Sequence, residues 1–192
     1  MIPLFETNLL LGDKVRLTGL RKEDVATILK WREDTRFLRL WNSDPLIDRS
    51  ESSIETWISE VGKARDEVTF GLRLADQEEL IGLIGLTEIE WPNRVADIGI
   101  GIGQPTHWGK GYGTEATHLL VKYAFNELNL YRLQLTVFAY NTRAMALYER
   151  MGFRKEGTFR LFAERDGQRY DMYLYGLLRD EWQDDCTASL KS

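Results

Sequence analysis

The sequence has few of the residues that build covalent or metal-bound frameworks. Its 192 residues contain a single cysteine, Cys186, so an intrachain disulfide cannot form. The two histidines, His107 and His118, are not spaced from each other or from Cys186 as zinc ligands are, so no metal site is expected. No run approaches the roughly 18 uncharged apolar residues of a membrane span. Because residues 1–12 also lack the basic start of a secretory signal, a cytoplasmic protein is expected.

An excess of basic residues is also missing. Lys and Arg number 25 against 30 Asp and Glu, a formal net charge of −5. This balance argues against nucleic-acid binding, which needs cations along the phosphate backbone, and mildly favours cationic small partners. The length and the 43% hydrophobic content are typical of one globular domain. We expect a single domain over 1–192, with an ordered core at about 8–182 and a polar tail over 183–192.

Hydrophobic periodicity predicts a mixed α/β (α+β) chain. The predicted order is strand, two helices, three strands, helix, strand, helix and two strands. The three central strands alternate and are joined by tight turns, which indicates an antiparallel meander. Before the second helix, Ser52-x-x-Glu55 matches a capping box. The helix beginning at Gly111 separates strands that must run parallel, because such a crossover cannot be a tight hairpin.

The most prominent local motif is the glycine-rich turn Trp108-Gly109-Lys110-Gly111-Tyr112-Gly113-Thr114, which follows a strand and opens a helix. Glycines permit close backbone approach and positive φ. The N–H groups of such a turn, together with a helix N-terminus, form an anion site. The motif therefore predicts a cradle for a pyrophosphate. The alternatives are a turn without a ligand and, for Lys110, a solvated side chain.

Two common nucleotide-binding motifs do not match this turn. A Walker loop requires Ser or Thr after the lysine, and Lys110 is followed by Gly111. A Rossmann fingerprint is G-x-G-x-x-G in an early βαβ unit, whereas Gly109, Gly111 and Gly113 are spaced G-x-G-x-G after the meander. A plain nucleotide-binding module is thus disfavoured by spacing and by context.

Several motifs together resemble the GNAT-fold acyl-CoA N-acyltransferases, in particular the subgroup of ribosomal-protein N-terminal acetyltransferases. The resemblance covers residues 8–182 and is carried by 96–99, by 108–116, by Asn141-x-x-Ala144-x-x-Leu147-Tyr148-x-x-x-Gly152-Phe153, and by 165–182. It implies a mixed, mostly antiparallel seven-stranded sheet flanked by about four helices and splayed between strands 4 and 5. Trp108 occupies the Gln/Arg position of the family's broad cradle pattern, a departure that is usual in the subgroup.

The resemblance also implies a cosubstrate, acetyl-CoA, and the residues that bind it. The implied set is Gly101, Ile102, Trp108, Gly109, Lys110, Gly111, Tyr112, Gly113, Thr114, Asn141, Ala144 and Tyr148. Asn141 also suits the N-cap of its helix, and in the family the matching Asn binds the pantetheine arm. The acetyl group would pass directly to an amine, without a covalent enzyme intermediate.

Such a reaction must neutralise the amine, polarise the thioester and stabilise the departing thiolate. By resemblance, Tyr148 contacts the sulfur as the general acid, although its helical face also suits the core. Asp97 matches the position of the base in some family members, and its shorter side chain favours a water relay. Glu88, Glu90 or water alone are the alternatives.

Strand alternation places Asp97, Gly99, Gly101 and Gly103 on one face, and Ile98, Ile100 and Ile102 on the other. The glycine face could leave room for an acceptor or for pantetheine, and the resemblance implies a bulge in this strand. The acceptor is expected between the helix pair 22–65, the loop 41–48 and the hairpin 159–175. A mouth for a cationic amine could be formed by Trp41, Asp44, Asp48 and Glu51, unless these side chains are simply solvated.

The sequence therefore predicts an N-acetyltransferase that acts on a protein N-terminus or on a small amine such as a polyamine or an aminoglycoside. A non-catalytic acyl-CoA sensor on the same fold is the second hypothesis. Because Tyr148 and the strand carboxylates are all present, an enzyme is favoured. A homodimer is left open.

Overall fold

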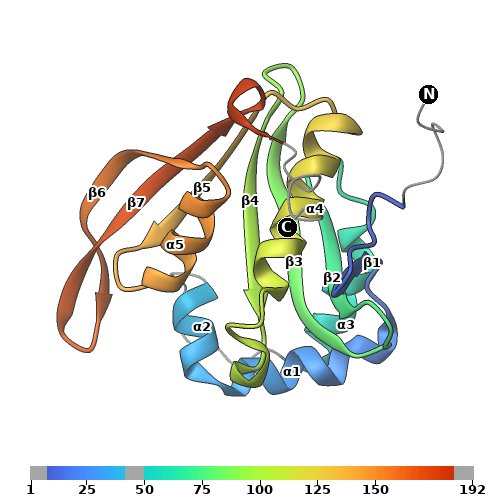
Figure 1. Cartoon of the computed structure of the whole chain (residues 1–192). Coiled ribbons are helices and arrows are strands. Elements are labelled where there is room, and N and C mark those ends of the chain that lie inside the picture. Colours follow the sequence, from blue (N-terminus) through green and yellow to red (C-terminus); the bar gives the residue numbers. More distant parts are fainter. Residues whose placement is uncertain (1–7, 42–49, 184–192) are drawn as a thin grey trace, which may run out of the picture.

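The computed structural model describes residues 8–41 and 50–183, and its core is one seven-stranded sheet in the order β1-β2-β3-β4-β5-β7-β6 (Figure 1). The strands are β1 (Val15–Thr18), β2 (Val68–Leu74), β3 (Leu80–Glu90), β4 (Val95–Ile102), β5 (Arg132–Phe138), β6 (Arg154–Arg165) and β7 (Gln168–Leu178). All neighbouring pairs are antiparallel except β4 and β5. The predicted meander and the single parallel step are both confirmed.

The described residues form five α-helices: α1 (Val25–Glu33), α2 (Thr35–Trp41), α3 (Glu51–Val61), α4 (Tyr112–Asn126) and α5 (Thr142–Arg150). Helix α2 was not expected from the sequence. The capping box predicted at Ser52 is wrong. Ser50 is the N-cap of α3, because its side-chain oxygen accepts a hydrogen bond from the Ser53 N–H at 3.3 Å. None of the described helices is long and apolar enough to cross a membrane.

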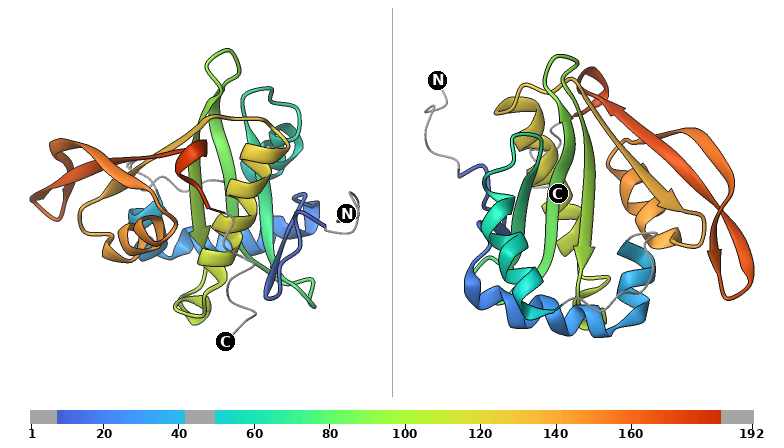
Figure 2. Two further views of the ribbon diagram at one scale, coloured as in Figure 1. Left: turned by 45° about the horizontal axis from the view of Figure 1, so that its top comes forward. Right: turned by 180° about the vertical axis from the view of Figure 1, so that it is seen from behind.

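The sheet splits between β4 and β5, as the family resemblance implies. These strands pair at three positions only, ending with Asp97 opposite Gln134, and then diverge (Figures 1 and 2). Beyond Asp97, β4 pairs with β3 alone. The edge of β4 that faces β5 therefore offers unpaired backbone N–H and C=O groups to an extended ligand.

Helices cover both faces of the sheet and create two separate apolar clusters. Helix α4 packs on one face, where Leu120, Val121 and Phe125 are fully buried against the strands. Helices α1, α2 and α3 pack on the other face around Trp31 and Ile54. Such burial of apolar surface is the main stabilising contribution to a fold of this size.

The alternation predicted for β4 is confirmed, and β4 itself has no bulge. Its register with β3 is continuous from Gly82 to Thr87, and the irregularity lies in β3, where Glu88 has φ +50°. The expected open glycine face is largely filled. A Cβ at Gly101 would lie 2.2 Å from the Trp41 ring, and one at Gly103 would lie 2.0 Å from the Trp31 ring. Aromatic side chains of α1 and α2 thus occupy the space that those glycines leave.

Candidate active site

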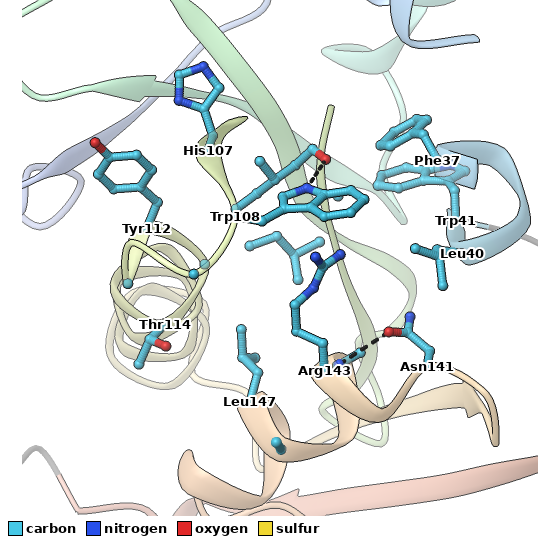
Figure 3. A pocket seen from close by; sticks show the side chains of 18 of the residues that line it. Phe37, Leu40, Trp41, His107, Trp108, Tyr112, Thr114, Asn141, Arg143 and Leu147 are labelled. Carbon is cyan, nitrogen blue, oxygen red and sulfur yellow. Dashed lines mark hydrogen bonds between the residues drawn. The ribbon is translucent and has the colours of Figure 1, made fainter. Parts of the chain in front are cut away.

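A cavity of about 310 Å³ lies where the glycine-rich turn, β4, α2 and α5 meet (Figure 3). Of the predicted cofactor residues, it is lined by Gly101, Ile102, Trp108, Gly109, Gly111, Tyr112, Gly113, Thr114, Asn141 and Ala144. Lys110 is exposed and outside this lining, and Tyr148 lines a neighbouring cavity instead. Most of the predicted set is therefore brought together by the fold.

The glycine-rich turn has the backbone of an anion cradle. Gly109 and Gly111 have φ of +74° and +85°, a region that side-chain-bearing residues rarely adopt. Gly111 is the N-cap of α4, so the first N–H groups of this helix have no acceptor within it. They point outward beside the positive end of the helix dipole, which suits a phosphate group.

Cations that were not predicted from the sequence add to this cradle. Arg143 and Arg150 of α5 both line the cavity. The Arg143 guanidinium lies 3.7 Å from the centre of the Trp108 ring, and the Trp108 indole N–H donates to the Ile102 carbonyl at 3.0 Å. Partial burial lowers the pKa of Arg143, although the residue as a whole is exposed. Its guanidinium is therefore open to pair with an anion bound in the cavity.

No short sequence motif identifies Arg143 as a residue of the binding site. The sequence places it one turn before Leu147 on an amphipathic helix, where an arginine is usually a solvated residue. Only the packing of α5 beside the turn after β4 brings its guanidinium over Trp108 (Figure 3).

A second cavity of about 310 Å³ adjoins the first, and Tyr148 lines it. Both cavities share the wall residues Leu40, Trp41, Ile100, Asn141 and Ala144. They thus meet at the opening between β4 and β5. A group held in the first cavity can reach the second across this wall.

Asn141 caps α5, as predicted. Its Oδ1 accepts a hydrogen bond from the Ala144 N–H at 3.2 Å. The amide nitrogen of the same side chain is not used by the cap, so it can donate to a ligand on the wall that both cavities share. The small side chain of Ala144, one turn later, lets a ligand pass close to the helix.

Tyr148 is 5% exposed, and its ring packs edge-on against Phe153 at 5.5 Å. Burial raises the pKa of its hydroxyl well above the ordinary value for tyrosine. The hydroxyl therefore stays protonated at neutral pH and can donate a hydrogen bond, but it cannot serve as a base. Both of the roles considered from the sequence, core packing and donation at the site, fit this position.

Asp97 lies at the last paired position of β4 and β5 and lines neither cavity. Burial raises the pKa of its carboxyl; Gln134 opposes the shift by hydrogen bonding, and the charge of Glu88 adds to it. A ligand held in either cavity would therefore not contact Asp97 directly. Glu90 lies farther along β3, where it accepts a hydrogen bond from Asn93.

The structure describes only two of the four residues predicted to form the acceptor mouth. Trp41 is 37% exposed and stacks on Phe37 at 5.6 Å, and Glu51 is exposed in the first turn of α3. Asp44 and Asp48 lie outside the described residues, as does Cys186. Within the described residues, no group of three or more His, Cys, Asp or Glu could hold a metal ion.

Comparison with known proteins identifies the family. Residues 14–154 match the acetyltransferase (GNAT) domain. The chain belongs to the GNAT N-acetyltransferases. The Bacillus subtilis protein YoaA, described as an uncharacterised N-acetyltransferase, is 31% identical over 93% of this chain and 98% of its own. YdaF of the same organism, whose name describes a ribosomal N-acetyltransferase, is 38% identical over 54% of this chain and 56% of its own.

A solved structure adds a ligand to the comparison. The spermidine N-acetyltransferase of Vibrio cholerae, in complex with CoA and spermine, is 26% identical, with a TM-score of 0.80 over 88% of this chain and 98% of its own. The resemblance inferred from the sequence motifs is thereby confirmed for family and fold. The glycine cradle and the Arg143 guanidinium of this GNAT protein fit the phosphates of a CoA thioester.

Proposed function

We propose that this GNAT protein transfers the acetyl group of acetyl-CoA directly to a primary amine, on a protein N-terminus or on a small molecule. The observation that carries the proposal is the pair of cavities with a common wall. One cavity offers an anion cradle, and the other contains a buried tyrosine hydroxyl. Donor and acceptor can thus be bound from two sides of the opening between β4 and β5.

The residues have separate roles in this proposal. N–H groups of the turn 109–114 and the Arg143 guanidinium would hold the phosphates of acetyl-CoA. The unpaired edge of β4 beyond Asp97 and the amide of Asn141 would orient the pantetheine arm. Lys110 would contribute charge only from the solvent side.

Tyr148 would donate its proton towards the departing thiolate. Its raised pKa keeps the hydroxyl neutral, so the stabilisation would come from a hydrogen bond to the developing charge. Asp97 would accept the amine proton through water, with its raised pKa closer to neutral pH than that of an ordinary aspartate. No group of the chain would be acylated.

Two measurements test this function. Saturable thermal stabilisation by CoA that exceeds that by ATP or NAD is expected, because the glycine spacing does not suit those nucleotides. Release of free CoA thiol from acetyl-CoA should then depend on an added amine. CoA binding without turnover on any amine would instead indicate an acyl-CoA sensor. The cytoplasmic location and the single domain over 1–192 stay predictions, and a homodimer stays open.

A further inference from the structure

The second cavity is lined mainly by uncharged side chains, most of them apolar. Most of its wall is apolar or aromatic: Leu40, Trp41, Ile98, Ile100, Val137, Phe138, Phe162 and Met172. Its polar side chains are those of Thr136, Asn141 and Tyr148, and no charged side chain is among its described lining residues. An ammonium group beyond the reacting amine would lose water here without gaining a charged partner from these walls.

A bulge in β6 contributes one aromatic residue, Phe162, to the lining of this cavity. Phe159 pairs with Met172 and Ala163 with Tyr170, so β6 carries two more residues than β7 between these pairs. Within the bulge, Leu161 has φ +52°, which is strained for a residue with a side chain. The bulge brings Phe162 to the cavity wall.

Two side chains of β7 hold this bulge. The Leu161 N–H donates to Asp171 Oδ1 at 2.8 Å, and the Leu161 carbonyl accepts from Arg169 Nη1 at 3.2 Å. Both backbone groups of the strained residue are therefore bonded to charged side chains. Hydrogen bonds of this kind are stronger than neutral ones, and they stabilise a conformation that local preference disfavours.

Phe162 nevertheless remains 49% exposed. Its neighbour Phe159, at a ring distance of 5.9 Å, is 46% exposed but does not line the cavity. A large apolar side chain that lines a cavity and is half in water is stabilised when an apolar ligand covers it.

We propose that the second cavity selects amines whose neighbouring group is apolar, either aromatic or branched aliphatic, and that Phe162 is a specificity-determining residue for them. This inference rests on the proposed acetyl transfer to an amine. A peptide that begins with an apolar residue and a free arylalkylamine share this chemistry. Asp171 acts as a positioning residue, because it touches the bulge and not the cavity.

The test compares kcat/KM by thiol release from acetyl-CoA. The acceptors are phenylalaninamide, leucinamide, glycinamide, phenethylamine, a peptide with N-terminal Phe and spermidine. Phenylalaninamide should exceed glycinamide by about 10-fold or more, as burial of one apolar side chain predicts. The peptide and phenethylamine arms distinguish a protein N-terminus from a free amine. Spermidine should have a lower kcat/KM than phenylalaninamide, because its further ammonium groups would lose water in the cavity without a charged partner.

Variants separate specificity from folding. Phe162→Ser should reduce the preference for phenylalaninamide to less than about 3-fold, mainly through a higher KM, with kcat/KM for glycinamide retained. Phe159→Ser is the matched control, since it removes an equally exposed aromatic residue beside the cavity and should keep the preference. Asp171→Ala should weaken the preference as Phe162→Ser does and leave glycinamide turnover in place.

The outcomes are distinct. Turnover that favours spermidine, or that shows no preference between phenylalaninamide and glycinamide, overturns the specificity and leaves the acetyltransferase function standing. Equal loss in the Phe159→Ser and Phe162→Ser variants overturns the assignment of Phe162. A preference for butyryl-CoA over acetyl-CoA that is lost in Phe162→Ser would overturn it too, because the cavity would then take the acyl chain. No turnover on any acceptor overturns the proposed function and the inference with it.

Discussion

The replacement Tyr148→Phe removes one hydroxyl from the wall of the second cavity. The ring stays packed on Phe153, and among the described residues no hydrogen-bond partner of this hydroxyl is lost. Removing a buried hydroxyl without a protein partner costs little stability, because no acceptor is left unsatisfied. The variant should therefore fold and unfold like the wild type.

The rate should change much more than the stability. One donor aimed at charge that develops in the transition state is worth about 2.7–4 kcal/mol, and each 1.36 kcal/mol is tenfold. We therefore expect kcat of Tyr148→Phe to fall by about 100- to 1000-fold. The KM for acetyl-CoA should stay within about 2-fold, since the cradle lies in the other cavity. Thiol release at saturating acceptor measures both.

Tyr175→Phe is the matched control. Tyr175 is 2% exposed, its hydroxyl donates to Glu149 Oε1 at 2.8 Å, and burial with this carboxylate raises its pKa to about 12. Losing a hydrogen bond to a charged group costs about 1.5–3 kcal/mol, so Tm should fall by roughly 3–12 °C while kcat is retained. If Tyr148→Phe keeps its rate, or if its Tm falls as much as that of Tyr175→Phe, the role given to Tyr148 is wrong.

Two further predictions concern β4. Asp97→Asn should lower kcat by about 100-fold and abolish the acid limb of the pH–rate profile, without loss of stability at pH 7. The folded protein raises the pKa of this carboxyl, so stability falls as pH rises from the unfolded pKa to the folded one, and the amide removes this cost. A lower Tm with unchanged kcat would contradict the assignment. Gly103→Ala should lower Tm by roughly 3–10 °C, because its Cβ would lie 2.0 Å from the buried Trp31 ring. Gly62→Ala has open space and should not change Tm, whereas equal shifts in both variants would refute the packing argument.

Local patterns were sufficient for most of the elements. The strand and helix boundaries follow from apolar periods of two and of about 3.6 residues, which depend on the backbone alone. The Asp166-Gly167 pair is a sequence typical of a tight hairpin turn, and both residues have positive φ, 53° and 76°. The Asn141 cap was predicted for the same reason, since a cap contacts the backbone three residues ahead. The sequence predicts the cap of α3 two residues late, because serines at 50, 52 and 53 offer competing caps.

The order of strands and helices, the glycine-rich turn and the cap at Asn141 can all be predicted from the sequence, because each depends on residues a few positions apart. Which side chains meet across the opening between β4 and β5 follows from the folded chain alone. Trp41 fills the space above Gly101 from a helix sixty residues earlier in the chain, Arg143 lies over Trp108, and a bulge held from β7 presents Phe162. Such contacts depend on how whole elements pack, and no local pattern encodes the distance between them.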